Sequence, residues 1–319
     1  MRVHISERNF IASQISDITF TDERFHPNQE GAIAYEHFHR YALACDFIIN
    51  KNVLDVACGE GYGSSLMAKT ANSVIGVDIS EEVISHARIK YASQSNLEFR
   101  CGSCLHIPCD SNLFDVVVCF ETVEHLAEHE GMLDEIISVL KQDGMLIISS
   151  PNKKTHSDDP AYKNKYHLKE LHLDEFIEIL NSRFKYITLM GQRLTFSSHI
   201  WPMESVASAC EFIHYFIDDL RIDSSISPPY EPMYFIAICT NSSNLSKNIG
   251  RVSLFTKRND SLCAHYNDIS EQILQKEKYL QSIINSWSWK ITRPLRWLYG
   301  KMIIKKSKND HYKLKVNER

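Results

Sequence analysis

Three closely spaced glycines follow a short apolar run that contains an aspartate. The aspartate is Asp55, and the glycines are Gly59, Gly61 and Gly63. Glycines at such a place let the backbone turn sharply and approach a ligand closely, because no Cβ intrudes. The spacing differs from G-x-G-x-x-G, in which a helix N-terminus receives a pyrophosphate. The turn therefore predicts close contact with a ligand other than the pyrophosphate of a dinucleotide.

A second acidic residue, Asp78, ends the next apolar run about twenty residues further along the chain. An acid at this place in an open α/β sheet reaches the hydroxyls of a ribose. The alternative is a tight turn in an unrelated α/β protein, with Asp78 serving only as a helix cap. Because the strand, the glycines and the acid all fall in register, we favour the cofactor interpretation.

Carboxylates and imidazoles follow two later strands. Glu121, Glu124 and His125 come after residues 114–120, and His167 and His172 follow the fifth strand after a long loop. Ligands of open α/β sheets bind at the carboxyl ends of the strands, where these side chains could hold a divalent cation or include a general base. His125, with Glu124 beside it, is our first choice for the catalytic role. In the alternative, the two glutamates are helix-entry acids, His125 caps the following helix, and His172 is a solvated histidine.

The elements that must position these groups are predicted from hydrophobic periodicity. Five apolar strands, at residues 52–58, 73–79, 97–100, 114–120 and 145–149, are separated by helices at 64–69, 80–91 and 126–140. Such an alternation indicates a parallel sheet covered on both faces. A helix at 173–180 follows, and strands at 184–190 and 233–240 should form an antiparallel pair at the sheet edge. Within an insertion at about 195–232 we expect a helix around 204–220.

Composition bounds the class of protein. The chain has 319 residues, a hydrophobic fraction of 44%, a net charge of −5 and nine irregularly spaced cysteines. The negative charge argues against a surface that binds nucleic acid throughout, and the cysteine pattern fits reduced thiols in the cytoplasm. We divide the chain into lid helices at 1–50, a catalytic domain at 51–240, a linker at 241–264 and a basic, amphipathic helical tail at 265–319.

The tail interleaves cations with aromatic residues. Trp287, Trp289 and Trp297 alternate with Lys290, Arg293 and other basic side chains. This pattern suits the anionic surface of a membrane, so we expect peripheral contact at the inner membrane face. A helix packed on the main domain, an oligomer contact and contact with single-stranded RNA are the alternatives.

The chain resembles the class I S-adenosylmethionine-dependent methyltransferases over residues 36–180. Residues 53–63 match the first motif of that family, 77–79 the second, 114–126 the fourth strand with its loop, and 140–152 the segment around the fifth strand. The resemblance implies a Rossmann-like, seven-stranded sheet with one reversed strand and S-adenosylmethionine as the cofactor. It also implies that further side chains lie near the cofactor, namely Ile79, Ser103, Cys104, Phe120 and Arg40. For Arg40 the alternative is an ordinary surface arginine.

Glu-x-x-Glu-His with a later histidine is similar to small-RNA 2′-O-methyltransferases and ubiquinone-type O-methyltransferases. That similarity implies Mg²⁺ or Mn²⁺ held by Glu121, Glu124, His125 and His167. The loop at 150–171 looks like methyltransferases of bacterial surface-polysaccharide biosynthesis, and residues 286–297 look like the ends of glycan-assembly proteins. We therefore predict O-methylation of a sugar hydroxyl or phosphate on a glycan or glycan precursor. A small aromatic or lipid-like acceptor, and a non-catalytic cofactor-binding scaffold, are the alternatives.

Overall fold

The structure is a computed structural model of the chain and describes residues 25–26, 29, 31–160, 164–195, 214–218, 221–225, 230–243, 253–255 and 261–292. The chain divides into two compact units, Met1–Lys257 and Arg258–Arg319. The first unit holds every residue of the predicted site.

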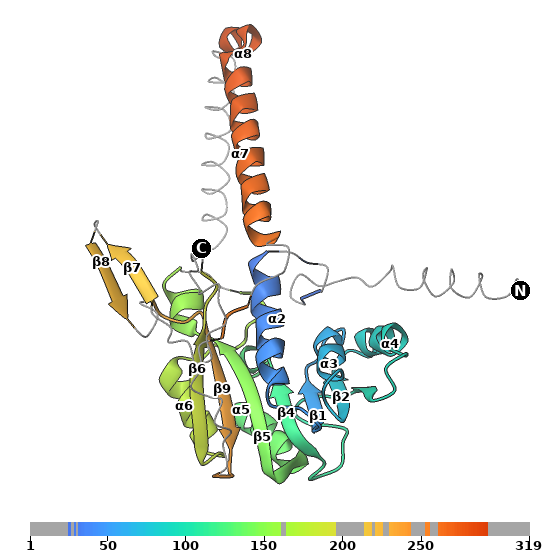
Figure 1. Cartoon of the computed structure of the whole chain (residues 1–319). Coiled ribbons are helices and arrows are strands. Elements are labelled where there is room, and N and C mark those ends of the chain that lie inside the picture. The colour runs from blue at the N-terminus through green and yellow to red at the C-terminus, as the bar shows by residue number, and fades with distance from the viewer. Residues whose placement is uncertain are drawn as a thin grey trace, which may run out of the picture. The chain divides into compact units, whose positions relative to one another are not determined.

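A seven-stranded sheet forms the centre of the first unit (Figure 1). The strand order is β3-β2-β1-β4-β5-β9-β6, and β9 runs antiparallel to both of its neighbours while the other neighbouring pairs are parallel. This confirms the predicted Rossmann-like sheet with one reversed strand and the antiparallel pair at its edge. The strands are β1 Asn52–Val56, β2 Ser73–Asp78, β3 Leu97–Cys101, β4 Phe114–Cys119, β5 Leu140–Pro151, β6 Tyr186–Gln192 and β9 Tyr234–Thr240.

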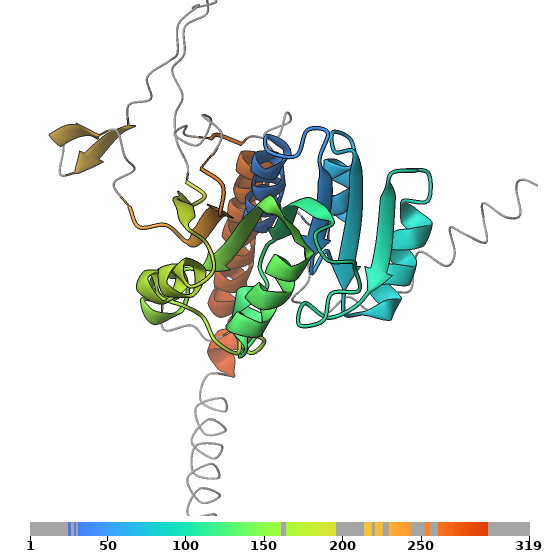
Figure 2. The same cartoon turned by 90° about the horizontal axis from the view of Figure 1, so that it is seen from below.

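Helices cover both faces of this sheet (Figure 2). Val53 of β1 packs in one apolar layer with α2 and α3, whereas its neighbour Leu54 packs in the other with α5 and α6. Successive strand residues face opposite sides, so a strand covered on both sides is mainly apolar on both faces. A third cluster joins α4 to β3 through Ile84, Ala87 and Phe99. The helices are α2 Ala32–Cys45, α3 Tyr62–Met67, α4 Glu81–Lys90, α5 His129–Val139 and α6 Leu173–Asn181.

The predicted helix around residues 204–220 is wrong where the structure describes that segment. Residues His214–Asp218 form strand β7, which pairs antiparallel with β8, Arg221–Ser225. Tyr215, Phe216 and Ile217 are aromatic or β-branched and favour an extended chain, and only two residues separate the strands, which is the length of a tight hairpin loop. The remainder of that prediction, residues 204–213, lies outside the described residues.

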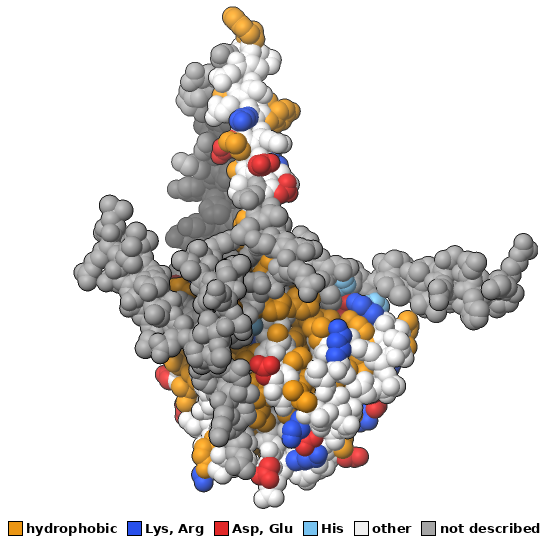
Figure 3. Space-filling model, in the orientation of Figure 1, with side chains coloured by type: hydrophobic (Ala, Val, Ile, Leu, Met, Phe, Trp, Pro, Cys, Tyr) orange, Lys and Arg blue, Asp and Glu red, His pale blue; other side chains and the backbone are white. Residues whose placement is uncertain are grey.

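The second unit contains α7, Ser261–Asn285, and α8, Trp287–Ile291. The first four residues of α7 are the last four residues of the predicted linker, 261–264. No helix among the described residues is both long enough and apolar enough to cross a bilayer. Hydrophobic side chains are nevertheless exposed along α7 and α8 (orange in Figure 3), and Trp287 is 82% exposed.

Helix α2, the predicted lid helix, packs directly onto the glycine turn. A Cβ added to Gly63 would lie 2.0 Å from Cζ of Tyr41, and a Cβ added to Gly61 would lie 2.4 Å from the ring of Phe99. Both glycines are therefore required for packing, and Gly61, with a φ of +78°, is required for the turn as well. The Tyr41 ring also contacts the rings of Tyr62 and Phe120 edge-on, at centroid distances of 5.3 and 5.2 Å.

Gly63→Ala should destabilise the first unit by about 3 kcal/mol, because the new methyl group overlaps a rigid ring. In a Tyr41→Ala background the overlap is gone, and the same substitution should stabilise by about 0.5–1 kcal/mol, since alanine favours the helix. Urea unfolding of the four proteins of this double-mutant cycle measures the coupling. An equal cost of Gly63→Ala in both backgrounds would show that Tyr41 does not impose the glycine.

Candidate active site

The glycine turn leaves open space at its first glycine. Nothing lies within 4 Å of the position where a Cβ on Gly59 would stand, and the φ of Gly59 is +54°. The Gly59 N–H donates to Oδ2 of Asp78 at 3.1 Å, and the Ser80 N–H donates to Oδ1 at 3.0 Å. Asp78 thus ties the turn to the end of β2. Ser80, whose hydroxyl accepts from the Val83 N–H, is the residue that caps α4.

Asp55 is fully buried beneath this turn. The Ser64 hydroxyl donates to Oδ2 at 2.6 Å, and the Tyr41 hydroxyl donates to Oδ1 at 3.2 Å. Burial raises the pKa of Asp55 to about 7, although the two hydroxyl donors act in the opposite direction. A positively charged group that arrived near this carboxyl would favour its ionised form.

The expected adenine side of the site lies where β2 and β3 end. Ile79 is 72% exposed, which is unusual for a large apolar side chain beside a buried sheet. The Gly102 N–H donates to the carbonyl of Asp78 at 3.0 Å, so the loop with Ser103 and Cys104 lies beside the end of β2. An apolar surface with hydroxyl and thiol groups near it fits the face and edge of a purine.

Arg40, from α2, is only 1% exposed, so the alternative of an ordinary surface arginine is wrong. Its Nη1 donates to Oε1 of Gln192 at 2.9 Å and lies 3.7 Å from Oε1 of Glu121, and its guanidinium lies 4.8 Å from the ring centre of Tyr234. Its Nε and Nη2 have no hydrogen-bond partner among the described residues. Two buried donors of one guanidinium are therefore available for an anionic group such as a carboxylate.

The segment with Glu124 and His125 is held by hydrogen bonds from the backbone of a loop far along the chain. Val123–His125 form the short 3₁₀ turn η1 after β4. The carbonyl of Glu124 accepts from the N–H groups of Leu168 and Lys169, at 2.8 and 3.1 Å. The Nδ1 of His125 lies 3.1 Å from the carbonyl oxygen of Tyr166. A carbonyl only accepts, so this nitrogen carries the proton in the neutral ring and Nε2 becomes the acceptor.

These bonds bring three of the four predicted metal ligands together. One ligand atom from each of Glu124, His125 and His167 lies within 4.8 Å of the others. The rings of the two histidines meet edge-to-face at 5.2 Å. Glu121 is engaged elsewhere, since its Oε1 accepts from the hydroxyl of Ser149 at 2.7 Å and faces Arg40.

Glu124 is the carboxylate whose protonation is most strongly perturbed at this edge. Burial raises its pKa well above the ordinary value, and the nearby Glu121 raises it further. Its Oε2 has no hydrogen-bond partner among the described residues. A cation held here would need the ionised carboxylate and would release a proton from it.

The helix-entry alternative for this segment is wrong. Helix α5 begins at His129, and its N-cap is Glu128, so His125 does not cap it. The helix predicted at 126–140 begins three residues later than expected, because the turn η1 ends at His125 and α5 begins only at His129. His172, by contrast, is the N-cap of α6, where its N–H donates to Oε2 of Glu175 at 2.9 Å.

Some residues of the site carried no signal that sequence reasoning used. Gln192 and Tyr234 contact Arg40 from strands far along the chain. His156 and Glu170 join His167 in a second group of potential ligands. The H-x-x-E spacing from His167 to Glu170 was the one available clue.

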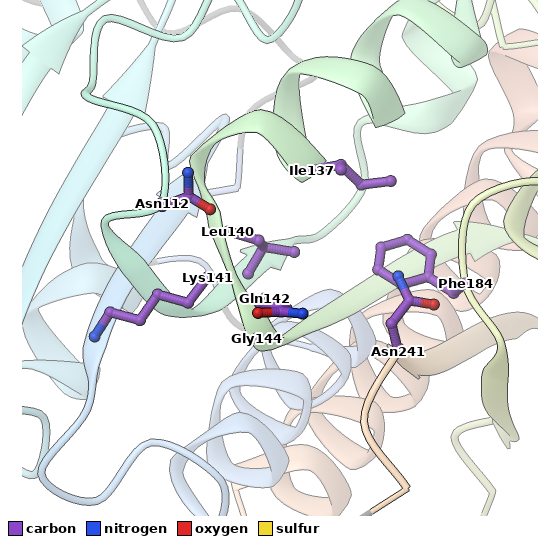
Figure 4. Close-up of a pocket in the computed structure, with 8 residues that line it drawn as sticks. All are labelled: Asn112, Ile137, Leu140, Lys141, Gln142, Gly144, Phe184 and Asn241. Carbon is purple, nitrogen blue, oxygen red and sulfur yellow. The ribbon is translucent and has the colours of Figure 1, made fainter.

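A recess of about 410 Å³ lies at the other end of the sheet (Figure 4). Asn112, Lys141, Phe184 and Asn241 are among its lining residues. They lie near the start of β5 and just past the end of the reversed β9, opposite the carboxyl ends of the parallel strands. It contains none of the predicted site residues.

Part of the chain is similar in sequence to known methyltransferases. Residues 49–200 match a family model described as a methyltransferase domain. A probable S-adenosylmethionine-dependent methyltransferase of Mycolicibacterium smegmatis is 34% identical over 148 residues, which are 46% of this chain and 54% of that protein. One of Mycobacterium tuberculosis is 33% identical over 168 residues, or 51% and 60% of the two chains.

A ubiquinone biosynthesis O-methyltransferase of Coxiella burnetii is 34% identical over 104 residues, covering 32% of this chain and 44% of that protein. Among solved structures, the N-methyltransferase NodS of Bradyrhizobium japonicum, in complex with S-adenosyl-L-homocysteine, gives a TM-score of 0.44 at 16% identity, over 58% of this chain and 91% of that one. The chain spans about half to three fifths of the length of the two mycobacterial relatives. Residues 49–200 are thus similar in sequence to a methyltransferase domain, and the central sheet has seven strands with one reversed strand.

The raised pKa of Asp55 predicts a specific dependence of stability on pH. The folded chain keeps this proton up to about pH 7, whereas the unfolded chain loses it near pH 4. Folding binds the proton within that window, so the contribution of Asp55 to the free energy of unfolding falls as the pH rises. Asp55→Asn should remove this loss, which amounts to at most about 4 kcal/mol.

Urea unfolding at about pH 4 and about pH 8 measures the effect as the difference between the two proteins, so that other titrating groups cancel. The stability of Asp55→Asn relative to the wild type should rise between the two pH values. A difference that stays constant would mean that Asp55 is ionised throughout.

Proposed function

We propose that the chain transfers a methyl group from S-adenosylmethionine to an oxygen of an acceptor molecule. The observation that carries the proposal is the joining of two half-sites by one helix. From α2, Tyr41 contacts Asp55 beneath the glycine turn, and its neighbour Arg40 contacts Glu121 beside the imidazole-carboxylate group. We call the glycine turn with Asp55 and Asp78 the nucleoside half, and the group of Glu121, Glu124 and His125 the acceptor half. The two halves are therefore adjacent at one edge of the sheet.

The residues present suit the cofactor. The open space at Gly59 would receive its amino-acid end, and the two unpartnered donors of Arg40 would bind its carboxylate. Asp78 would accept from the ribose hydroxyls, since a carboxylate oxygen can accept more than one hydrogen bond. The exposed Ile79 would cover the adenine, with Ser103 and Cys104 near the ring edge. The cofactor supplies an electrophilic methyl group on a sulfonium.

An alcohol is a poor nucleophile until its proton is removed. The Nε2 of His125 is the ring acceptor in the neutral tautomer, and Glu124 lies 3.9 Å from it. The Nε2 of His125, with Glu124 beside it, would take the proton of an acceptor hydroxyl. In the alternative, Mg²⁺ or Mn²⁺ would be held by Glu124, His125 and His167, with Glu121 adjacent; Nε2 would then bind the metal, and the metal would lower the pKa of that hydroxyl.

We infer that the acceptor is a sugar hydroxyl or phosphate of a glycan or glycan precursor. This rests on the likeness of residues 150–171 and 286–297 to proteins of bacterial polysaccharide assembly. A small aromatic or lipid-like acceptor is the second candidate, because one relative is named as a ubiquinone biosynthesis O-methyltransferase. We place the enzyme in the cytoplasm, at the inner membrane face if the tail binds lipid.

Asp78→Asn should weaken the binding of S-adenosylhomocysteine roughly thirtyfold, or about 2 kcal/mol, because an amide oxygen replaces a charged acceptor of the ribose hydroxyls. Calorimetry with the purified chain measures this, and NADH should give no binding heat.

In cells, mass spectrometry of surface glycans should show one methyl mass lost without the gene. The wild type should restore that mass, whereas His125→Ala should not.

Tight nucleoside binding with unchanged glycans would redirect the search to the aromatic or lipid-like acceptor. Tight binding without turnover of any acceptor would favour the non-catalytic scaffold. Binding of NADH in place of S-adenosylhomocysteine would overturn the proposal itself.

We also propose that the second unit contacts an anionic membrane. Trp287 and Trp289 are both exposed on α8, where their rings could lie among lipid headgroups. The chain should float with anionic liposomes and much less with neutral ones, since the basic tail contributes attraction. Replacing both tryptophans by serine should remove most of the floating fraction. Flotation that is unchanged by this replacement would discard the membrane contact.

A further inference from the structure

His156 and Glu170 form a polar cluster with His167. The proposed chemistry uses neither His156 nor Glu170. His156 belongs to the π-helical turn Lys154–Asp158 after β5, and Glu170 precedes α6. The Oε1 of Glu170 lies 3.4 Å from Nδ1 of His156 and 2.5 Å from Nδ1 of His167. The two imidazoles stack at a centroid distance of 5.4 Å and an angle of 25°.

We propose that His156, His167 and Glu170 form a second metal site, which takes a divalent transition metal such as Zn²⁺ or Co²⁺. One ligand atom from each residue lies within 4.8 Å of the others. Two imidazoles and one carboxylate, with positions left for water or substrate, are the ligand set of catalytic zinc and of non-haem iron.

An unsatisfied carboxylate oxygen supports the site independently. The Glu170 side chain is only 7% exposed, and its Oε2 has no hydrogen-bond partner among the described residues. A buried carboxylate oxygen without a partner costs free energy, which a bound cation would offset.

Hydrogen bonds around Asn152 hold the segments that carry His156 and Glu170. The His156 N–H donates to the carbonyl of Asn152 at 2.8 Å. The Asn152 side chain in turn donates to the carbonyl of Pro232 at 2.9 Å, and Asn152 forms a β-bridge with Leu171, the residue after Glu170. Both ligand-bearing segments are thus fixed to the end of β5, and π-helical turns are frequent at functional sites.

This site shares one residue with the group of Glu124, His125 and His167. His167→Gln removes a ligand from both groups, whereas His125 belongs only to the first and His156 and Glu170 only to the second. The two sites can therefore be separated by substitution. Metal binding at the second site is independent of methyl transfer, while a role for that metal in activating an acceptor hydroxyl rests on the proposed function.

Cobalt(II) added to the metal-free full chain tests the site, because bound cobalt has a visible absorption that reports its ligands. His156→Gln and Glu170→Gln should each lower the affinity of the second site at least roughly tenfold. His125→Gln should leave that site and its absorption unchanged. His167→Gln should abolish it, and the control His106→Gln, an exposed imidazole in neither group, should match the wild type.

Thermal unfolding of each variant shows whether it is folded. The proposal is overturned if the wild type binds no cobalt, if His156→Gln and Glu170→Gln bind it as the wild type does, or if His125→Gln abolishes all binding. Binding of S-adenosylhomocysteine is measured separately on the same samples. Cobalt binding without nucleoside binding would contradict the proposed function and leave the metal site standing, and the reverse result would do the opposite.

Discussion

The buried carboxyl of Asp55 is the contact on which the nucleoside half of the molecule depends. It accepts hydrogen bonds from Ser64, after the glycine turn, and from Tyr41 of the lid helix. A carboxyl taken out of water needs such partners, so the first strand, the turn and the lid are tied to one another. Arg40, the residue before Tyr41 in the same helix, contacts Glu121 on the acceptor half. Any movement of α2 would therefore alter both halves together.

The acceptor half follows a different principle, because backbone bonds rather than a buried charge bring it together. Two N–H groups of the loop before α6 bind the carbonyl of Glu124, and the carbonyl of Tyr166 binds His125. The side chains of Glu124 and His167 are thereby left to face each other. In a site built in this way, the backbone rather than bonds between the side chains fixes where the potential ligand atoms lie.

Much of the fold and the arrangement around the glycine turn could be predicted from sequence, because both depend on local patterns. Apolar runs alternating with helices imply a parallel sheet, in which Gly59 follows the first strand and Asp78 ends the second. The partners of Arg40 could not be predicted, since Gln192 is 152 residues away and meets it only through the order of the sheet. The hairpin at residues 214–225 was missed because short apolar segments suit a helix or a strand equally. The cluster of His156 with Glu170 depends on two loops whose approach no periodicity encodes.

A crystal structure of the chain with S-adenosylhomocysteine would test the central claim most directly, namely that one edge of the sheet holds both the nucleoside and the groups that activate the acceptor. The account predicts the ribose against Asp78, the amino-acid end at Gly59, and the sulfur facing the side of the site where Glu124 and His125 lie. A nucleoside bound elsewhere, or one whose sulfur faces away from those two residues, would contradict it.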